Sequence, residues 1–313
     1  MTAIQTSHLS KSFADLAAVH DLNLTVNEGE LFGLVGPDGA GKTTTMRLLA
    51  SILEPTSGDA WVAGSHVVRE AEAVKLRIGY MSQRFGLYPD LTVAENIAFY
   101  ADLYNVPRQD RPERLTRLLA FSNLTPFQMR LAGQLSGGMK QKLALTCALI
   151  HTPRVLLLDE PTSGVDPVSR REFWRLLSEL VHAGVTIFVS TAYLDEAERF
   201  HRLALLHQGQ LLACGTPAEV KKLLRGAILE IRCAEPRAAA QTLRQQFPSA
   251  SLLLFGDRIH LVSEHPEQDT IRAQAALGAA GHPPTNIRVI EPTLEDAFVS
   301  VLSEERSADG SSH

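Results

Sequence analysis

The sequence is poor in cysteine. Its 313 residues include only Cys147, Cys214 and Cys233, which stand far apart with no CxxC pair and no histidine cluster beside them. A disulfide framework or a structural zinc site needs closely spaced cysteines, so neither is expected. Sparse, unpaired thiols indicate a reducing compartment, and we expect the protein to be cytoplasmic.

Long apolar runs and a leader are also missing. No apolar stretch approaches the ~18 residues that a membrane-spanning helix needs. The opening residues, MTAIQTSHLSKSF, contain neither a basic region nor an apolar one, so no signal peptide is predicted. We therefore expect any action at a membrane to be exerted through a partner.

Positive charge is not in excess. Lysine and arginine total 30 against 35 aspartate and glutamate residues, for a formal net charge of −5. Nucleic-acid binders usually present a basic face, so we expect no nucleic-acid partner. The hydrophobic fraction of 45% is enough for a sizeable core.

What is present, over residues 1–225, is an alternation of strands and helices. Apolar runs at 31–35, 155–158 and 186–190 are typical of strands buried on both faces, and residues 3–8 and 19–26 alternate as half-exposed strands do. The order predicts an α/β fold with a parallel sheet, interrupted by a helical subdomain at about 85–150. Helices are also predicted at 42–52, 168–182 and 194–200, and a hairpin at 203–207 and 210–214.

A second, smaller domain is predicted at 226–302. Its pattern is strand, helix, strand, strand, helix, strand, at 227–233, 237–247, 251–255, 258–263, 267–280 and 286–290. This βαββαβ order predicts an α+β ferredoxin-like domain. The small, polar residues 303–313 are predicted to form a disordered tail.

Residues 36–43 match GxxxxGK[ST] between a buried strand and a helix. In such a loop the backbone N–H groups and the helix N-terminus cradle phosphates. Lys42 is expected to reach the β- and γ-phosphates, and the Thr43 hydroxyl to ligate Mg²⁺. The loop residues predicted to bind nucleotide are Gly36, Pro37, Asp38, Gly39, Ala40, Gly41, Lys42, Thr43 and Thr44.

Two carboxylates end the apolar strand at 155–158. Asp159 is placed to hold Mg²⁺, directly or through water, and Glu160 to polarise an attacking water as a catalytic residue. Many buried strands end in an acidic loop, so this pair alone is a weak indication of a magnesium site. It becomes a strong one because a phosphate loop precedes it in the same chain.

Ser136, Gly137 and Gly138 stand before an apolar helix. A hydroxyl, two free N–H groups and a helix N-terminus make a second anion site, although an N-capped helix alone gives the same pattern. Two such sites in one chain suggest that two chains share a nucleotide.

With Leu-Ser-Gly-Gly-Met-Lys-Gln at 135–141, residues 1–225 resemble the ATP-binding cassette of ABC transporters, a P-loop fold with a RecA-like core. The resemblance implies that Gln83 is the Q-loop glutamine, which senses Mg²⁺ and the attacking water and so counts as a metal and catalytic residue. It also implies a D-loop ending in Asp166 and a surface for the transmembrane subunit at 84–104. Phe13 stands where the family has an adenine-stacking aromatic, although a lone phenylalanine is more often core.

Three segments narrow the resemblance. Residues 36–44, 83–88 and 291–298 are similar to those of the ATP-binding subunits of bacterial ABC-2-type exporters, including multidrug efflux systems. The resemblance implies an ATPase with ATP and Mg²⁺ as ligands, peripheral on the inner face of the cell membrane. Its partners would be an ABC-2-type permease and a second cassette subunit, and the permease would be its only contact with the membrane.

One position departs from the family. Ala192 stands where the family has a histidine that contacts the γ-phosphate, and a methyl group cannot donate that hydrogen bond. Loss of such a donor typically costs ~10²–10³ in rate. We expect a slow, ATP-holding site whose Ser136 segment completes a faster site on another cassette; the alternative is a homodimer in which Glu160 and Gln83 suffice.

The sequence thus predicts a subunit that energises drug or xenobiotic export through a separate permease. Three alternatives stay open: a cassette ATPase acting on ribosomes or DNA, a regulatory ATP-binding partner with little turnover, and an importer ATPase.

Overall fold

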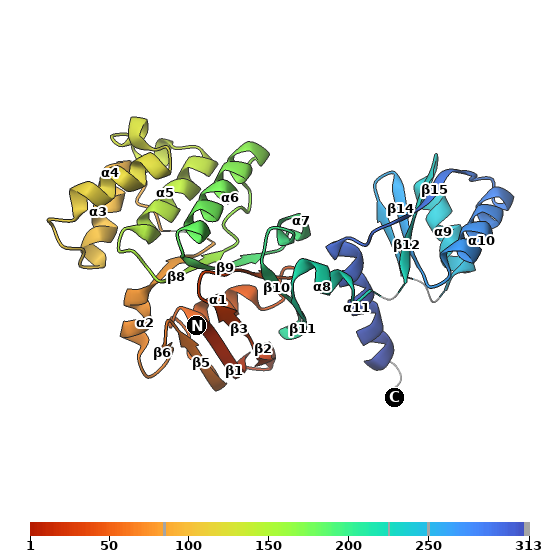
Figure 1. Ribbon diagram of the computed structural model, residues 1–313, viewed down its shortest axis with the longest axis horizontal. Coiled ribbons are helices and arrows are strands. Elements are labelled where there is room, and N and C mark those ends of the chain that lie inside the picture. Colours follow the sequence, from red (N-terminus) through yellow and green to blue (C-terminus); the bar gives the residue numbers. More distant parts are fainter. Residues whose placement is uncertain (84–85, 225, 249–250, 310–313) are drawn as a thin grey trace. The chain divides into compact units, whose positions relative to one another are not determined.

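The computed structural model describes residues 1–83, 86–224, 226–248 and 251–309, with side chains to residue 302. The chain divides into two compact units, Met1–Cys214 and Gly215–His313 (Figure 1).

A six-stranded sheet forms the centre of the first unit. Its order is β11-β10-β4-β9-β8-β7, and the neighbours from β10 to β7 run parallel. Every residue of the third, fourth and fifth strands in that order is buried, as the apolar runs predict. The strands are β4 (Leu31–Val35), β7 (Ile78–Met81), β8 (Val155–Asp159), β9 (Thr186–Thr191), β10 (Arg202–His207) and β11 (Gln210–Gly215).

An antiparallel sheet packs against the same core. Its long first strand pairs with three others. The predicted strand segments 3–8 and 19–26 cover only parts of this sheet. The strands are β1 (Thr2–Phe13), β2 (Leu16–Leu22), β3 (Thr25–Asn27), β5 (Ser57–Val62) and β6 (Ser65–His66).

Helix α1 (Lys42–Leu49) lies between the two sheets, in contact with β8 and β9 on one side and β2 and β5 on the other. Figure 1 shows α6 (Pro167–His182) on the opposite face of β8 and β9, and α7 (Leu194–Ala197) contacts β4 and β9. Helix α1 is shorter than the predicted 42–52 because Ser51 takes a left-handed conformation with φ 56°. A further helix, α2 (Ala71–Arg77), precedes β7.

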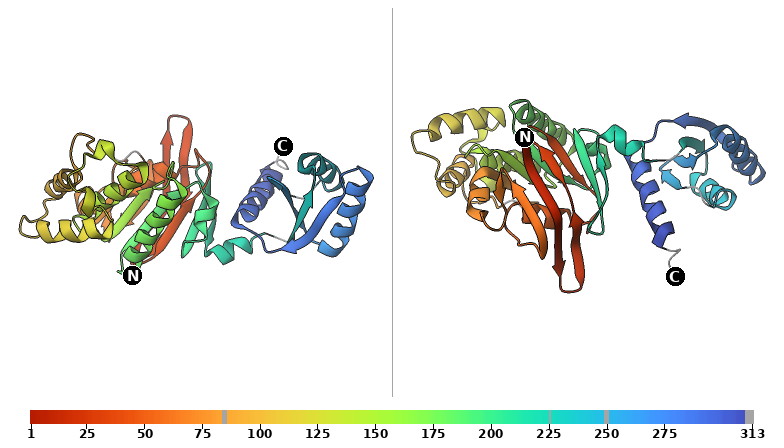
Figure 2. Two further views of the ribbon diagram at one scale, coloured as in Figure 1. Left: turned by 90° about the horizontal axis from the view of Figure 1, so that it is seen from above. Right: turned by 60° about the horizontal axis from the view of Figure 1, so that its bottom comes forward.

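The predicted helical subdomain is inserted between β7 and β8. It consists of α3 (Val93–Leu103), α4 (Arg111–Phe121), the short 3₁₀ turns η1 (Thr125–Phe127) and η2 (Ala132–Gln134), and α5 (Gly137–Leu149). Thr92 and Glu95 form a capping box that starts α3. Helix α5 packs on α3, α4, α6 and β7, while the yellow helices α3 and α4 lie together at one end of the unit in both views of Figure 2.

The second unit contains the predicted βαββαβ pattern. Its four-stranded sheet has the order β13-β14-β12-β15 with antiparallel neighbours, as in a ferredoxin-like fold. Its core lies between β12, β14 and two helices. The elements are α8 (Pro217–Lys221), β12 (Ala227–Cys233), α9 (Pro236–Gln246), β13 (Leu252–Phe255), β14 (Arg258–Ser263), α10 (Pro266–Ala279), β15 (Pro284–Ile290) and α11 (Leu294–Asp309).

Two boundaries differ from the prediction. The second unit begins at Gly215 rather than at residue 226, because α8 packs on α11. Helix α11 continues to Asp309, so the expectation of a disordered tail from residue 303 is wrong for residues 303–309; residues 310–313 lie outside the described part. Among the described residues, no helix has the length and apolarity needed to cross a bilayer.

Candidate nucleotide site

The loop between β4 and α1 has the backbone of a phosphate cradle. Gly41, at the N-cap of α1, has φ +99°, and a Cβ there would lie 2.3 Å from the carbonyl oxygen of Ala18. Only glycine fits both the angle and the space. The Lys42 side chain is buried and folds back over the loop, where its Nζ donates to the carbonyl oxygens of Gly36 (2.8 Å) and Pro37 (3.0 Å).

Asp159 ends β8 and is 1% exposed. Its Oδ1 accepts hydrogen bonds from Ser190 Oγ (2.6 Å) and Thr43 Oγ1 (3.2 Å), while no described residue bonds its buried Oδ2. Burial raises the pKa of this carboxyl, against the opposing effect of the two hydroxyl donors. A buried carboxylate oxygen without a partner, beside a threonine hydroxyl, is suited to a hard cation such as Mg²⁺.

The Glu160 carboxylate lies between the side chains of Lys42 and Gln83. Its Oε1 is 3.1 Å from Lys42 Nζ, and its Oε2 accepts from Gln83 Nε2 at 2.9 Å. The Glu160 backbone takes a left-handed φ of 48°, and its N–H donates to the carbonyl oxygen (3.1 Å) and hydroxyl (3.0 Å) of Ser190. The carboxylate is therefore held next to the phosphate loop from two sides.

Lys42, Gln83 and Glu160 line one cleft of about 830 Å³, and Asp159 is not among the described residues that line it. Phe13, at the end of β1, lines it and is 44% exposed, so its ring is accessible to a flat base. The predicted residues among the lining are Phe13, Asp38, Gly39, Ala40, Gly41, Lys42, Thr43, Thr44, Gln83 and Glu160.

Four other lining residues, Leu16, Ala17, Ala18 and Gln208, are missed by sequence reasoning. The turn after β10 reaches the phosphate loop, where the Gly209 N–H donates to the Ala40 carbonyl oxygen at 3.0 Å. Gln-Gly is a visible turn signal, but nothing in it shows that the turn meets this loop. The alanines carry no signal at all.

Ser136, Gly137, Gly138 and Asp166 are not among the described residues that line the cleft. Ser136 caps α5 by accepting from the Met139 N–H at 3.3 Å, and Gly137 has open space around it. Asp166 caps α6, accepting from the N–H groups of Val168 and Ser169. Within one chain these residues serve helix ends, and their part in nucleotide binding stays a prediction.

Ala192 follows β9 directly and is exposed. It is not among the described lining residues, and its methyl group offers no donor to the cleft. The structure therefore supplies no histidine at this position.

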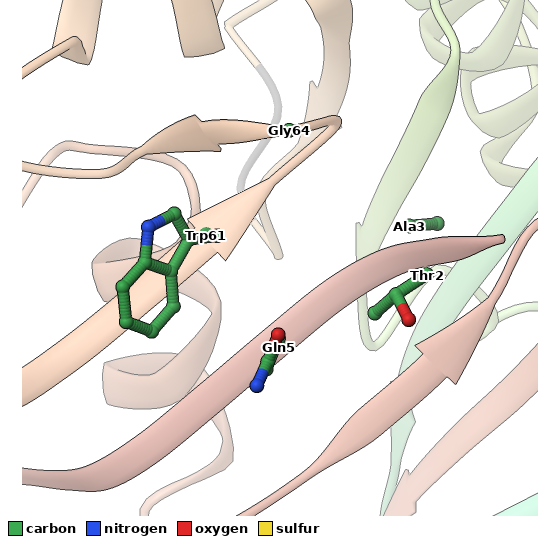
Figure 3. A pocket seen from close by; sticks show the side chains of 5 residues that line it. All are labelled: Thr2, Ala3, Gln5, Trp61 and Gly64. Carbon is green, nitrogen blue, oxygen red and sulfur yellow. The ribbon is translucent and has the colours of Figure 1, made fainter.

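A second hollow, of about 330 Å³, lies on the antiparallel sheet (Figure 3). The described residues that line it are Thr2, Ala3, Gln5, Trp61 and Gly64. None of these carries an ionisable side chain, so the chemistry points to the first cleft.

The fold and the cleft define a nucleotide-binding protein with a phosphate loop. Residues 19–163 match the ABC transporter family. The probable multidrug ABC transporter ATP-binding protein YbhF of Escherichia coli K12 is 44% identical over 306 residues, or 96% of this chain and 52% of that protein. The daunorubicin resistance ATP-binding protein DrrA3 of Streptomyces coeruleorubidus is 35% identical over 97% of both chains. The chain thus spans about half the length of the first relative and nearly all of the second.

Comparison with solved structures leads to the same family. An ATP-binding subunit of an ABC transporter has a TM-score of 0.65 at 28% identity, over 71% of this chain and 92% of that one. MJ0796, a bacterial ABC transporter cassette solved as a dimer, has a TM-score of 0.63 at 26% identity, over 68% and 98% of the two chains. The chain belongs to the ATP-binding proteins of ABC transporters. The predicted cassette fold is confirmed.

Proposed function

We propose that this chain hydrolyses ATP and energises export through a separate ABC-2-type permease, with a drug or another xenobiotic as cargo. One observation carries the proposal: Glu160 lies within hydrogen-bond distance of both Lys42 and Gln83, beside Asp159 and the phosphate loop. Relatives named for multidrug transport and drug resistance support export over import and over action on ribosomes or DNA.

In this mechanism the phosphate loop and Lys42 bind the β- and γ-phosphates, and Glu160 accepts a proton from the attacking water. Phe13 stacks on the base. Mg²⁺, when bound, neutralises phosphate charge; Thr43, Asp159 and Gln83 are the residues that would hold it.

The site is completed by a second cassette subunit. Ser136, Gly137 and Gly138 do not line the chain's own cleft, and the related MJ0796 cassette was solved as a dimer. The Ser136 segment of one subunit, together with Asp166 at the end of its D-loop, would face the phosphates in the other. The resulting ATP-dependent closure is differential binding to two conformations.

The permease would dock beside α3 and α5. A groove of about 290 Å³ is lined there by Leu87, Pro89, Ala132, Gly133, Lys140, Gln141 and Ala144. Tyr88, Phe99 and Leu103, all on the predicted contact segment 84–104, are exposed apolar side chains. Exposed aromatics next to a groove are typical of a protein interface. Through this contact the subunit would be held at the inner face of the cell membrane.

Steady-state hydrolysis by the purified chain with Mg²⁺, beside a Glu160→Gln control, tests the proposal. Turnover that disappears in the control supports it. Tight ATP binding without turnover would favour a second function, an ATP-holding partner in a heterodimer, for which Ala192 is the specific reason. An Ala192→His variant with an unchanged rate would remove that reason.

A further inference from the structure

A single buried carboxylate ties together the segments that surround Glu160. Glu196, in α7, is 1% exposed and lies outside the cleft lining. Its Oε1 accepts from Thr162 Oγ1 (2.7 Å) and Trp174 Nε1 (3.0 Å) and is 2.9 Å from Arg170 Nε, and its Oε2 accepts from Thr191 Oγ1 (2.7 Å). Three of the four donors lie at Oε1 and one at Oε2, so both oxygens of the buried carboxylate have partners.

Two of these donors belong to the catalytic segments. Thr162 stands two residues after Glu160, in the loop that leads to the D-loop. Thr191 ends β9 directly before Ala192, and its carbonyl oxygen accepts from the Gly36 N–H of the phosphate loop at 3.2 Å. Both threonine side chains are buried. Through them Glu196 is bonded to the loop that carries Glu160 and to the strand that contacts the phosphate loop.

The other two donors belong to α6, which begins at the D-loop. Helix α6 also contacts α5, the helix that Ser136 caps: a Cβ on Gly138 would lie 2.3 Å from Ser169, and Lys142 is paired with Glu172. The same carboxylate therefore connects the chain's own cleft with the element that carries Ser136.

We propose that Glu196 is a positioning residue for ATP hydrolysis, which fixes the loop of Glu160 relative to the end of β9 through Thr162 and Thr191. This inference rests on the proposed function. Burying a charge is costly unless it is paired and hydrogen-bonded, and here the pairing joins three segments: the loop after Glu160, the end of β9 and helix α6.

Trp174 provides a direct reporter of this cluster. Its indole is 5% exposed and bonded to Glu196. The sequence has two tryptophans, so Trp61→Phe leaves Trp174 as the only source of tryptophan emission. Movement of the cluster when nucleotide binds changes the environment of that indole.

The experiment compares Glu196→Gln, Thr162→Val and Thr191→Val in the Trp61→Phe background. Glutamine keeps one acceptor oxygen and loses the charge. We expect kcat to fall on the order of 10-fold, as for groups that orient a reacting residue, with the ATP Kd within about twofold. The valine variants combined with Glu196→Gln should cost little more than Glu196→Gln alone, because they act through it. Thr162→Ser and Thr191→Ser keep the hydroxyl and should restore the rate.

Glu230→Gln is the matched control, a buried glutamate on β12 outside the cleft, and should leave kcat unchanged while thermal melting tracks folding.

Normal kcat in a folded Glu196→Gln variant overturns the inference and leaves the proposed function intact. If Glu196→Gln fails to fold, the threonine variants decide: unchanged kcat in both overturns it. If the parent chain binds ATP without turnover, the proposed function fails, and the Trp174 emission change on ATP binding decides instead. Loss of this emission change in Thr191→Val supports the connection through Glu196, and a retained emission change overturns the inference.

Discussion

The hydroxyl of Ser190 is predicted to keep the carboxylate of Asp159 ready for a cation. Ser190→Ala removes the 2.6 Å donor to Oδ1 and one of the two acceptors of the Glu160 N–H, which retains the Ser190 carbonyl oxygen. A hydrogen bond to a charged group contributes about 1.5–3 kcal/mol. The free energy of unfolding at neutral pH should fall by about that amount.

The pH dependence follows from the direction of the shift. Burial already raises the pKa of Asp159, and the Ser190 hydroxyl works against that rise, so its loss raises the pKa further. The proton and Mg²⁺ compete for the same oxygens. The acid limb of Mg²⁺-dependent turnover should therefore move to higher pH. The stability cost of the substitution should be largest above the folded pKa and shrink as the pH falls through it, because a protonated carboxyl needs the donor less.

Urea unfolding at acidic and neutral pH, together with a pH–rate profile, measures both effects. Thr146→Val is the matched control: its buried hydroxyl donates to the Lys142 carbonyl oxygen within α5. The control should lose about 1 kcal/mol, as for a neutral hydrogen bond, with no shift of the acid limb. An acid limb that stays in place in Ser190→Ala would refute the reasoning.

Three further outcomes are expected. Glu160→Gln should bind ATP at least as tightly as the wild type, because it removes a negative charge 3.1 Å from Lys42, and should turn over at least about 10²-fold more slowly; ATP binding and hydrolysis assays check both, and near-normal turnover would argue against Glu160 as the base. Gly41→Ala should weaken ATP binding at least ~10-fold, since the left-handed backbone alone costs roughly 1–2 kcal/mol and the new Cβ meets the Ala18 carbonyl, whereas Ala at Gly39, which has open space, should lose only the backbone part. Asp296→Asn should lower the thermal stability of the second unit at neutral pH. Burial raises the pKa of Asp296, but hydrogen bonds from His260 and Thr293 outweigh burial and lower the pKa. The stabilisation is therefore present above the ordinary value of 3.8 and is lost as the pH falls below it. Equal melting temperatures for the two proteins at neutral pH would contradict this.

Much of the fold follows from local pattern. The buried strands could be predicted because β4 and β8 are unbroken apolar runs followed by residues with recognisable chemistry. Strand β5, with the sequence Ser-Gly-Asp-Ala-Trp-Val, has no such run and is a strand because it pairs with β1. Sequence pattern cannot show a pairing between segments some 50 residues apart when neither is strongly apolar.

The site divides in the same way. Lys42, Asp159 and Glu160 could be named as candidates because only certain side chains can do the chemistry expected of them, and the structure places Glu160 beside Lys42. Ala18 and Gly209 meet the phosphate loop through backbone groups that every residue has, so nothing in the sequence shows that they lie beside it. Ser190 is an ordinary serine until the fold brings its hydroxyl to Asp159.

Each of the three N–H groups of the Lys42 ammonium can be matched to an acceptor among the described residues. An ammonium has three N–H groups, and Gly36, Pro37 and Glu160 offer three acceptors. A phosphate oxygen that binds Lys42 would therefore displace one of these acceptors, and the carboxylate of Glu160 is the acceptor on a movable side chain. Under the proposed function, this exchange would release the Glu160 carboxylate from Lys42 when a phosphate oxygen binds the lysine. In the proposed mechanism, Lys42 therefore links phosphate binding to the freedom of the Glu160 side chain.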